Sequence, residues 1–102
     1  MQKEILELHN LIKLKNIDKA YVEAKKLYKL DKKNQDIVKV LAYLHIQKSN
    51  FDSAITVLDE YYEENSAEKD FDYYVNKGIS LKSIEEFEKS LSMYDKATEI
   101  NS

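Results

Sequence analysis

The chain contains 102 residues, of which 16 are basic and 19 are acidic, and its formal net charge is −3. A domain of this length buries only about 60–70% of the surface that its unfolded chain exposes, so its core is thin. One Gly, no Pro and no Cys predict an all-α fold and exclude disulfides, thiolate metal sites and Cys nucleophiles. All the basic residues are Lys, and the absence of Arg disfavours recognition of nucleic acid.

The first expected pair of helices lies within residues 1–34. The segment 1–7 contains acidic residues where a signal peptide needs an unbroken apolar run, and no stretch reaches transmembrane length. Asn16 lies at an expected helix start, because an Asn side chain can accept a hydrogen bond from a free backbone amide there. We therefore expect two helices in this segment, no insertion into a membrane and a cytoplasmic location.

The second expected pair lies within residues 35–70. Asn34 precedes its first helix, and Ser49 or Asn50 precedes its second helix, where these residue types are typical N-caps. The charged segment 63–70 is expected to connect this pair to the next. A surface connection can lengthen at little energetic cost, so we place the extra residues of this pair there.

The third expected pair lies within residues 71–102. Ser83 and Glu86 have the spacing of a capping box, in which each side chain satisfies a free backbone amide at the start of a helix. The sequence therefore predicts Ser83 as the N-cap of the last helix.

The second helices of the three pairs share a pattern that recurs at a nearly fixed interval. A large apolar residue, an acidic residue, a polar residue and a small residue open the segments IDKAYVEA at 17–24, FDSAITVL at 51–58 and FEKSLSMY at 87–94. The small residues Ala20, Ala54 and Ser90 are separated by 34 and 36 positions. A period of this length indicates stacked helix pairs, in which a small residue allows two helices to cross closely.

This pattern resembles the tetratricopeptide repeat, and the resemblance covers the whole chain. At the W-x-x-L-G-x-x-Y spacing of the family's first helix, the second pair supplies Val38, Leu41, Ala42 and His45, and the third supplies Tyr74, Lys77, Gly78 and Leu81. The only Gly thus falls on the small position, whereas Lys77 stands where Leu is usual. The resemblance implies one domain over 1–102, with repeats 1–34, 35–70 and 71–102. Its implied fold is a right-handed α-solenoid of six helices with no obvious C-terminal capping helix.

The first helix of the first repeat fits this pattern in two registers one residue apart. One register uses Ile5, Leu8, His9 and Ile12. The other uses Leu8 and Leu11. We favour the first register, because it places Leu8 rather than Glu7 in the buried row.

The resemblance also implies that the chain is a scaffold that binds another protein. The first helices of such stacked pairs line a concave groove. The residues that this predicts to contact a partner are Leu6, Lys13, Lys39, Val40, Tyr43, Ile46, Gln47, Asp72, Val75, Asn76, Ile79 and Lys82. This lining is apolar with a fringe of Lys and amide side chains, which favours a peptide or an amphipathic helix as the ligand over an acidic chaperone tail. Val40, Ile46 and Val75 are equally well explained as core between repeats.

No pattern in the sequence indicates catalysis, so we expect neither an enzyme nor a metal or cofactor site. His9 and His45 are too far apart in sequence for a local metal motif. His45 falls on an aromatic position facing a partner helix, which favours a role in the core. The single Gly cannot form a Gly-rich phosphate loop.

Two other functions remain open from the sequence. The chain could be a homo-oligomer or part of a longer array, because the stripe Ile84, Phe87, Leu91 and Tyr94 is assigned to its own repeat while Met93 and Ile100 are left at an uncovered end. Residues 1–34 carry a charge of +4 and residues 35–70 a charge of −5, which favours head-to-tail contact. A helical-repeat RNA binder of the pentatricopeptide kind predicts a basic groove, against which the acidic composition argues.

Overall fold

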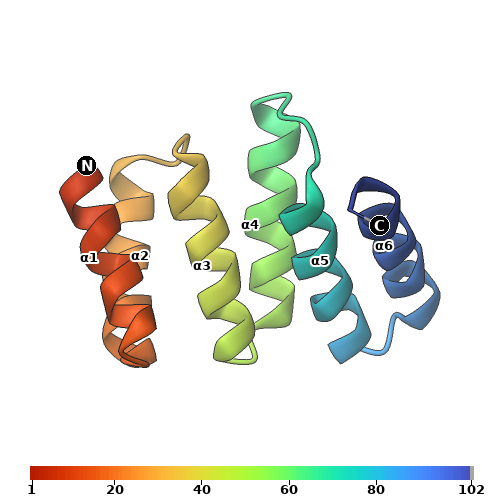
Figure 1. Ribbon diagram of the computed structural model, residues 1–102, viewed down its shortest axis with the longest axis horizontal. Coiled ribbons are helices and arrows are strands. Elements are labelled where there is room, and N and C mark those ends of the chain that lie inside the picture. Colours follow the sequence, from red (N-terminus) through yellow and green to blue (C-terminus); the bar gives the residue numbers. More distant parts are fainter. Residues whose placement is uncertain (102) are drawn as a thin grey trace.

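The computed structural model describes residues 1–101, which form six α-helices and no strand (Figure 1). The helices are α1 (Gln2–Lys13), α2 (Ile17–Leu30), α3 (Gln35–Gln47), α4 (Phe51–Glu64), α5 (Phe71–Ser83) and α6 (Phe87–Ile100). The predicted all-α fold is therefore confirmed. The end of the third predicted repeat, Ser102, lies outside the described residues.

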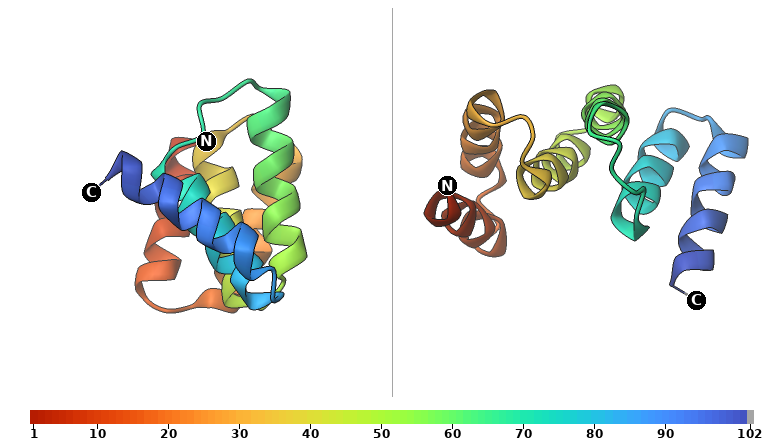
Figure 2. Two further views of the ribbon diagram at one scale, coloured as in Figure 1. Left: turned by 90° about the vertical axis from the view of Figure 1, so that its right-hand side faces the viewer. Right: turned by 90° about the horizontal axis from the view of Figure 1, so that it is seen from above.

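The helices stand side by side in one row, and each packs against the next one along the chain. Seen from above, α1, α3 and α5 lie on one side of the row and α2 and α4 on the other (Figure 2). α3 and α5 also contact each other directly. None of the helices in residues 1–101 has the length and apolarity that crossing a membrane requires. The right-handed winding of the row stays a prediction.

The turns inside the three helix pairs have the same conformation. Their middle residues are Lys15, Ser49 and Glu85, with φ angles of 63°, 61° and 65°. In each turn the residue after the middle one (Asn16, Asn50 or Glu86) donates its backbone amide to the carbonyl oxygen five residues earlier, at 2.7–2.9 Å. This pattern satisfies free carbonyl groups at a helix end and reverses the chain. The second helix of each pair therefore leaves its first helix in the same direction.

The recurring small residues lie at equivalent, buried positions. Ala20, Ala54 and Ser90 each donate their backbone amide to the residue that immediately precedes the helix. Ser90 also donates its Oγ to the carbonyl oxygen of Gly78 at 2.8 Å. A Cβ atom on Gly78 would lie only 3.0 Å from the ring of Tyr94. The predicted close crossing of small residues is confirmed for this pair.

The hydrophobic core is centred on the middle pair of helices. Its largest fully buried side chains include Leu8, Ile37, Val38, Leu44, Leu58 and Tyr62. Each of the aliphatic ones contributes about 1.5–3 kcal/mol through burial. The continuous core cluster has members from α1 to α5 and none from α6, so α6 is attached at the edge of the core.

The turn geometry decides the register of α1, and the favoured register is wrong. α1 and α3 end the same number of residues before the helix that follows each of them. Leu8 and Leu11 therefore correspond to Ala42 and His45, as in the second register. His9 is exposed, in contrast to the favoured reading, whereas Ile5 and Leu8 are buried and Glu7 is exposed, as that reading expected. The expectation failed because an exposed Glu7 costs little where no helix of residues 1–101 packs against that side of α1.

The predicted capping box at Ser83 and Glu86 is also wrong. α5 continues through Ser83, whose Oγ donates to the carbonyl oxygen of Ile79 at 2.9 Å. Glu86 is itself the N-cap of α6 and makes no capping bond with its side chain. The shared turn therefore overrides the local motif and starts the last helix three residues later than expected, with Glu86 rather than Ser83 as its N-cap.

The remaining helix starts agree with the expectations. Asn34 caps α3, and its Oδ1 accepts hydrogen bonds from the amides of Asp36 and Ile37 at 3.0 and 3.3 Å. Asn16 and Asn50 are the N-cap residues of α2 and α4, without a capping bond from the side chain. The connection after α4 is longer than the one after α2, which confirms where the extra residues lie.

Ile84, Phe87 and Leu91 of the predicted stripe are exposed, against the expectation that the stripe packs within its own pair. Tyr94 meets that expectation, because its ring lies against Gly78 of α5. Phe87 is 61% exposed and Leu91 is 62% exposed. Met93, expected at the uncovered end, is half-buried instead. Ile100 is exposed as expected. Phe87 and Leu91 lie on the side of α6 that no other helix of residues 1–101 contacts, which the sequence of one helix does not reveal.

Candidate functional site

A hollow of about 360 Å³ lies on the side of the row formed by the first helices of the pairs. Its lining consists of His9, Ile12, Asp36, Lys39, Val40, Tyr43, Asp72 and Asn76. We call this surface the first-helix groove. It contains residues of α1, α3 and α5, so it needs all three pairs to be stacked in register.

The groove brings together only some of the residues expected to contact a partner. Those that line it are Lys39, Val40, Tyr43, Asp72 and Asn76. The other predicted residues are Leu6, Lys13, Gln47 and Lys82, which are exposed, and Ile46, Val75 and Ile79, which are half-buried. They lie outside the lining of this hollow.

Three lining residues were missed by the sequence reasoning. His9, Ile12 and Asp36 lie one repeat before the predicted residues Tyr43, Ile46 and Asp72. His9 and Ile12 were assigned to the buried row by the wrong register of α1. Applying the repeat interval to every predicted residue would have found all three.

The floor of the groove is apolar. Val40 is buried and belongs to the core cluster, and Ile12 is packed against that cluster. Tyr43 is 39% exposed and adds a ring with a polar hydroxyl. Val40 therefore serves both readings given above, since it is core and also lines the groove. A ligand that covers this floor would remove apolar surface from water.

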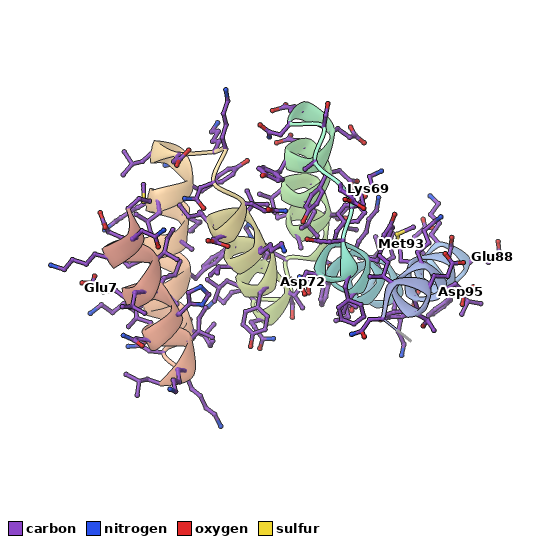
Figure 3. The ribbon with its side chains drawn as sticks, turned by 45° about the horizontal axis from the view of Figure 1, so that its top comes forward. Glu7, Lys69, Asp72, Glu88, Met93 and Asp95 are labelled. Carbon is purple, nitrogen blue, oxygen red and sulfur yellow. The ribbon has the colours of Figure 1, made fainter. Side chains whose placement is uncertain are left out.

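Lys39 is held by two carboxylates at the edge of the groove. Its Nζ lies 2.8 Å from Asp70 Oδ2 and 3.2 Å from Asp72 Oδ2. Burial opposes the charged form, but the hydrogen bonds to both carboxylates outweigh it and hold the pKa of Lys39 above its usual value. The expected Lys fringe is therefore wrong for this groove, because its one lining Lys is already paired. Asp36 and Asp72 make the rim acidic (Figure 3 labels Asp72).

Asp70 fixes the wall of the groove by joining three helices. It is the N-cap of α5, where its Oδ1 accepts a hydrogen bond from the amide of Tyr73 at 3.0 Å. The hydroxyl of Tyr62 donates to the same oxygen at 3.0 Å, and Gln35 donates to that hydroxyl at 3.3 Å. Burial alone would raise the pKa of Asp70, but Lys39 and these donors lower it. Burial raises the pKa of Tyr62 to about 12, so its hydroxyl stays a donor at neutral pH.

His45 lies between α2 and α3 and makes a structural contact. Its Nδ1 is 3.1 Å from the hydroxyl of Tyr21, and the two rings meet edge to face at 5.3 Å. Asn50 donates to the same hydroxyl at 2.9 Å. Burial, and then the charge of Lys25, lower the pKa of His45. The contacts agree with the expected role of His45 between helices.

Comparison with known proteins identifies the repeat. A family model of the tetratricopeptide repeat matches residues 11–71. The chain belongs to the tetratricopeptide repeat family. Searches of curated proteins and of solved structures gave no match.

The family match runs from the end of α1 to the start of α5. The third tetratricopeptide-like pair, α5 and α6, lies almost wholly beyond it and is recognised by the shared turn at Glu85 and by the crossing of Ser90 with Gly78. Tetratricopeptide repeats are generally modules for protein–protein interaction. The family is typically a non-enzymatic scaffold.

Proposed function

We propose that the first-helix groove binds a peptide or an amphipathic helix of another protein. The observation that carries this proposal is the apolar floor of Ile12, Val40 and Tyr43 beside the acidic rim of Asp36 and Asp72. Helices with apolar anchors dock in grooves of this kind. The acidic rim favours a ligand whose anchors are flanked by Lys or Arg, because opposite charges steer association.

The expected affinity is moderate. Each anchor buried on the groove floor contributes about 1.5–3 kcal/mol, and association costs about 4–15 kcal/mol in lost freedom. Several anchors are therefore needed: a micromolar complex, about −8 kcal/mol, requires a gross gain of at least about 12 kcal/mol, which corresponds to about four or more fully buried anchors. Tyr43 is the strongest single candidate, since Tyr is enriched among residues that dominate binding energy.

Capture of partners by the full chain tests this proposal. Tyr43→Ala removes an anchor, and Asp36→Lys reverses the rim charge. Both variants should retain less than a tenth of the partner bound by the wild type. Lys26→Glu is the matched control, because Lys26 is exposed on α2, on the other side of the row, and it should retain the partner. Undiminished capture by both groove variants would contradict the proposal.

An RNA-binding groove is disfavoured by the same geometry. Phosphate recognition needs free cationic side chains. The groove instead offers Asp36 and Asp72, and Lys39 already contacts two carboxylates.

A further inference from the structure

The exposed side of α6 repeats the side of α4 on which α5 packs. A shift of 36 residues relates Phe51, Ile55 and Asp59 of α4 to Phe87, Leu91 and Asp95 of α6. The three α4 residues are half-buried, and the three α6 residues are exposed. We call Phe87, Leu91 and Asp95 the α6 face. No other helix of residues 1–101 covers it, and it forms one end of the row (Figure 1).

The contact between α4 and α5 shows which chemistry such a face accepts. Tyr73 donates its hydroxyl to Asp59 Oδ1 at 2.7 Å. Lys77 places its Nζ 3.0 and 3.1 Å from the two carboxylate oxygens of Asp59, and 3.1 Å from the Tyr73 hydroxyl. Tyr73 and Lys77 are four residues apart, so they lie on one face of α5. The carboxylate of Asp59 thus favours a packed helix that carries a Lys one turn after an aromatic residue with a hydroxyl group.

We propose that the α6 face binds an amphipathic helix of another protein that presents Lys to Asp95 and apolar side chains to Phe87 and Leu91. The correspondence with α4 supplies both parts of this recognition, since the apolar residues and the acid recur at the same spacing. This surface is separate from the first-helix groove, so the inference does not depend on what the groove binds.

A second copy of the chain fits the α6 face poorly in head-to-tail contact. The opposite end of the row is α1, which carries Glu7 at the position where α5 carries Lys77. In the same way, α1 carries Glu4 at the position where α5 carries Tyr74. Both Glu4 and Glu7 are exposed. Figure 3 shows Glu7 and Asp95 at opposite ends of the row, so head-to-tail stacking would bring the two like charges together. Lys3, one turn earlier on α1, is the only base that α1 would offer in this part of the contact.

The probe for this proposal is a synthetic peptide that copies residues 65–84, the connection and helix that α4 already binds. The peptide is titrated into the full-length chain labelled with ¹⁵N, and amide chemical shifts locate the binding site. We expect the shift changes to concentrate on α6. Asp95→Lys in the protein and Lys77→Glu in the peptide should each weaken binding about tenfold, and the two changes combined should restore most of the affinity because the charges are exchanged.

Glu88→Lys is the matched control for Asp95→Lys. It makes the same charge change on the same helix, and its counterpart on α4, Asp52, is exposed. Its counterpart on α2, Asp18, contacts Lys48, but the peptide carries Ile84 at the position of Lys48 and so offers Glu88 no Lys there. Figure 3 labels both Glu88 and Asp95 on α6. The control should bind the peptide as tightly as the wild type, and circular dichroism should show equal helix content in both variants.

Three results would overturn the proposal. The first is shift changes on α4 instead of α6, which would mean that the peptide displaces the protein's own α5. The second is equal affinity for the wild type and Asp95→Lys, with no restoration by the exchanged pair. The third is a concentration-dependent dimer that Leu91→Glu abolishes in sedimentation, which would show that a second copy covers the α6 face.

Discussion

Replacement of Asp59 by Ala tests how α4 and α5 are held together. The Asp59 side chain is 28% exposed and that of Lys77 is 21% exposed, whereas Tyr73 is 2% exposed. One carboxylate therefore satisfies both a buried hydroxyl and a partly buried ammonium group. Without this carboxylate, Lys77 can turn towards water and bind it, but the buried hydroxyl of Tyr73 is left without an acceptor.

The expected loss follows from this difference. A buried hydroxyl without an acceptor costs about 1–3 kcal/mol. The ion pair with Lys77 is partly exposed and screened by solvent, so it adds about 0.5 kcal/mol. Asp59→Ala should thus lower the free energy of unfolding by about 2 kcal/mol. For a domain of this size such a loss lowers the melting temperature by about 10 °C.

Urea unfolding followed by circular dichroism at 222 nm measures this loss. A double-mutant cycle of Asp59→Ala and Tyr73→Phe should give a coupling energy of about 1 kcal/mol or more, because the two side chains share one hydrogen bond. Asp52→Ala, an exposed acid on the same helix, should stay within about 0.5 kcal/mol of the wild type. Additive effects of Asp59→Ala and Tyr73→Phe would refute the reasoning.

Three further predictions concern a cap, a turn and a pH dependence. Asn34→Ala should cost about 1 kcal/mol in urea unfolding, and a similar cost for Asn16→Ala, whose side chain makes no capping bond, would contradict the role of the cap. Glu85→Gly should raise stability by about 0.5–1 kcal/mol in the same assay, because Gly adopts a positive φ without strain; a loss would show that the turn is not strained. Burial, and then Lys25, lower the pKa of His45, so the unfolded chain takes up its proton first, and stability present above about pH 6.5 should fall as the pH drops below that value. His45→Gln should remove that part of the pH dependence of thermal unfolding, and an unchanged slope would exclude His45 as its source.

The repeat was predictable because it depends on the size of single side chains at fixed positions in each helix. Ala20, Ala54 and Ser90 occupy equivalent buried positions, and Ser90 lies at a close helix crossing with Gly78, so their interval appears directly in the sequence. The longer connection at 65–70 follows from the same interval, since added residues must lie where the helices do not need them. The short segment around each small residue was therefore enough to predict which helices pair.

The charge of the groove could not be predicted from the same pattern. Lys39 lies on α3, and its partners Asp70 and Asp72 lie 31 and 33 residues later in the sequence, at the start of α5. Whether a predicted groove Lys is free depends on which side chains the stacking places beside it. The register of α1 failed for a related reason, because the cost of an exposed Glu7 depends on whether a neighbouring helix covers it.

Ion pairs between an acidic residue and a Lys join neighbouring helix pairs, and their arrangement bears on the α6 face. Asp18 on α2 contacts Lys48 at the end of α3, and Asp59 on α4 contacts Lys77 on α5. In both cases the second helix of one pair provides the acid and the following pair provides the Lys, but the acids take different positions, since Asp18 corresponds to Glu88 of α6 and Asp59 corresponds to Asp95. Asp95 lies on the second helix of the third pair at the position of Asp59, and none of the ion pairs within residues 1–101 includes it. A helix that supplies this Lys should bind less tightly as salt rises, because Asp95 is exposed and screening acts on exposed pairs first.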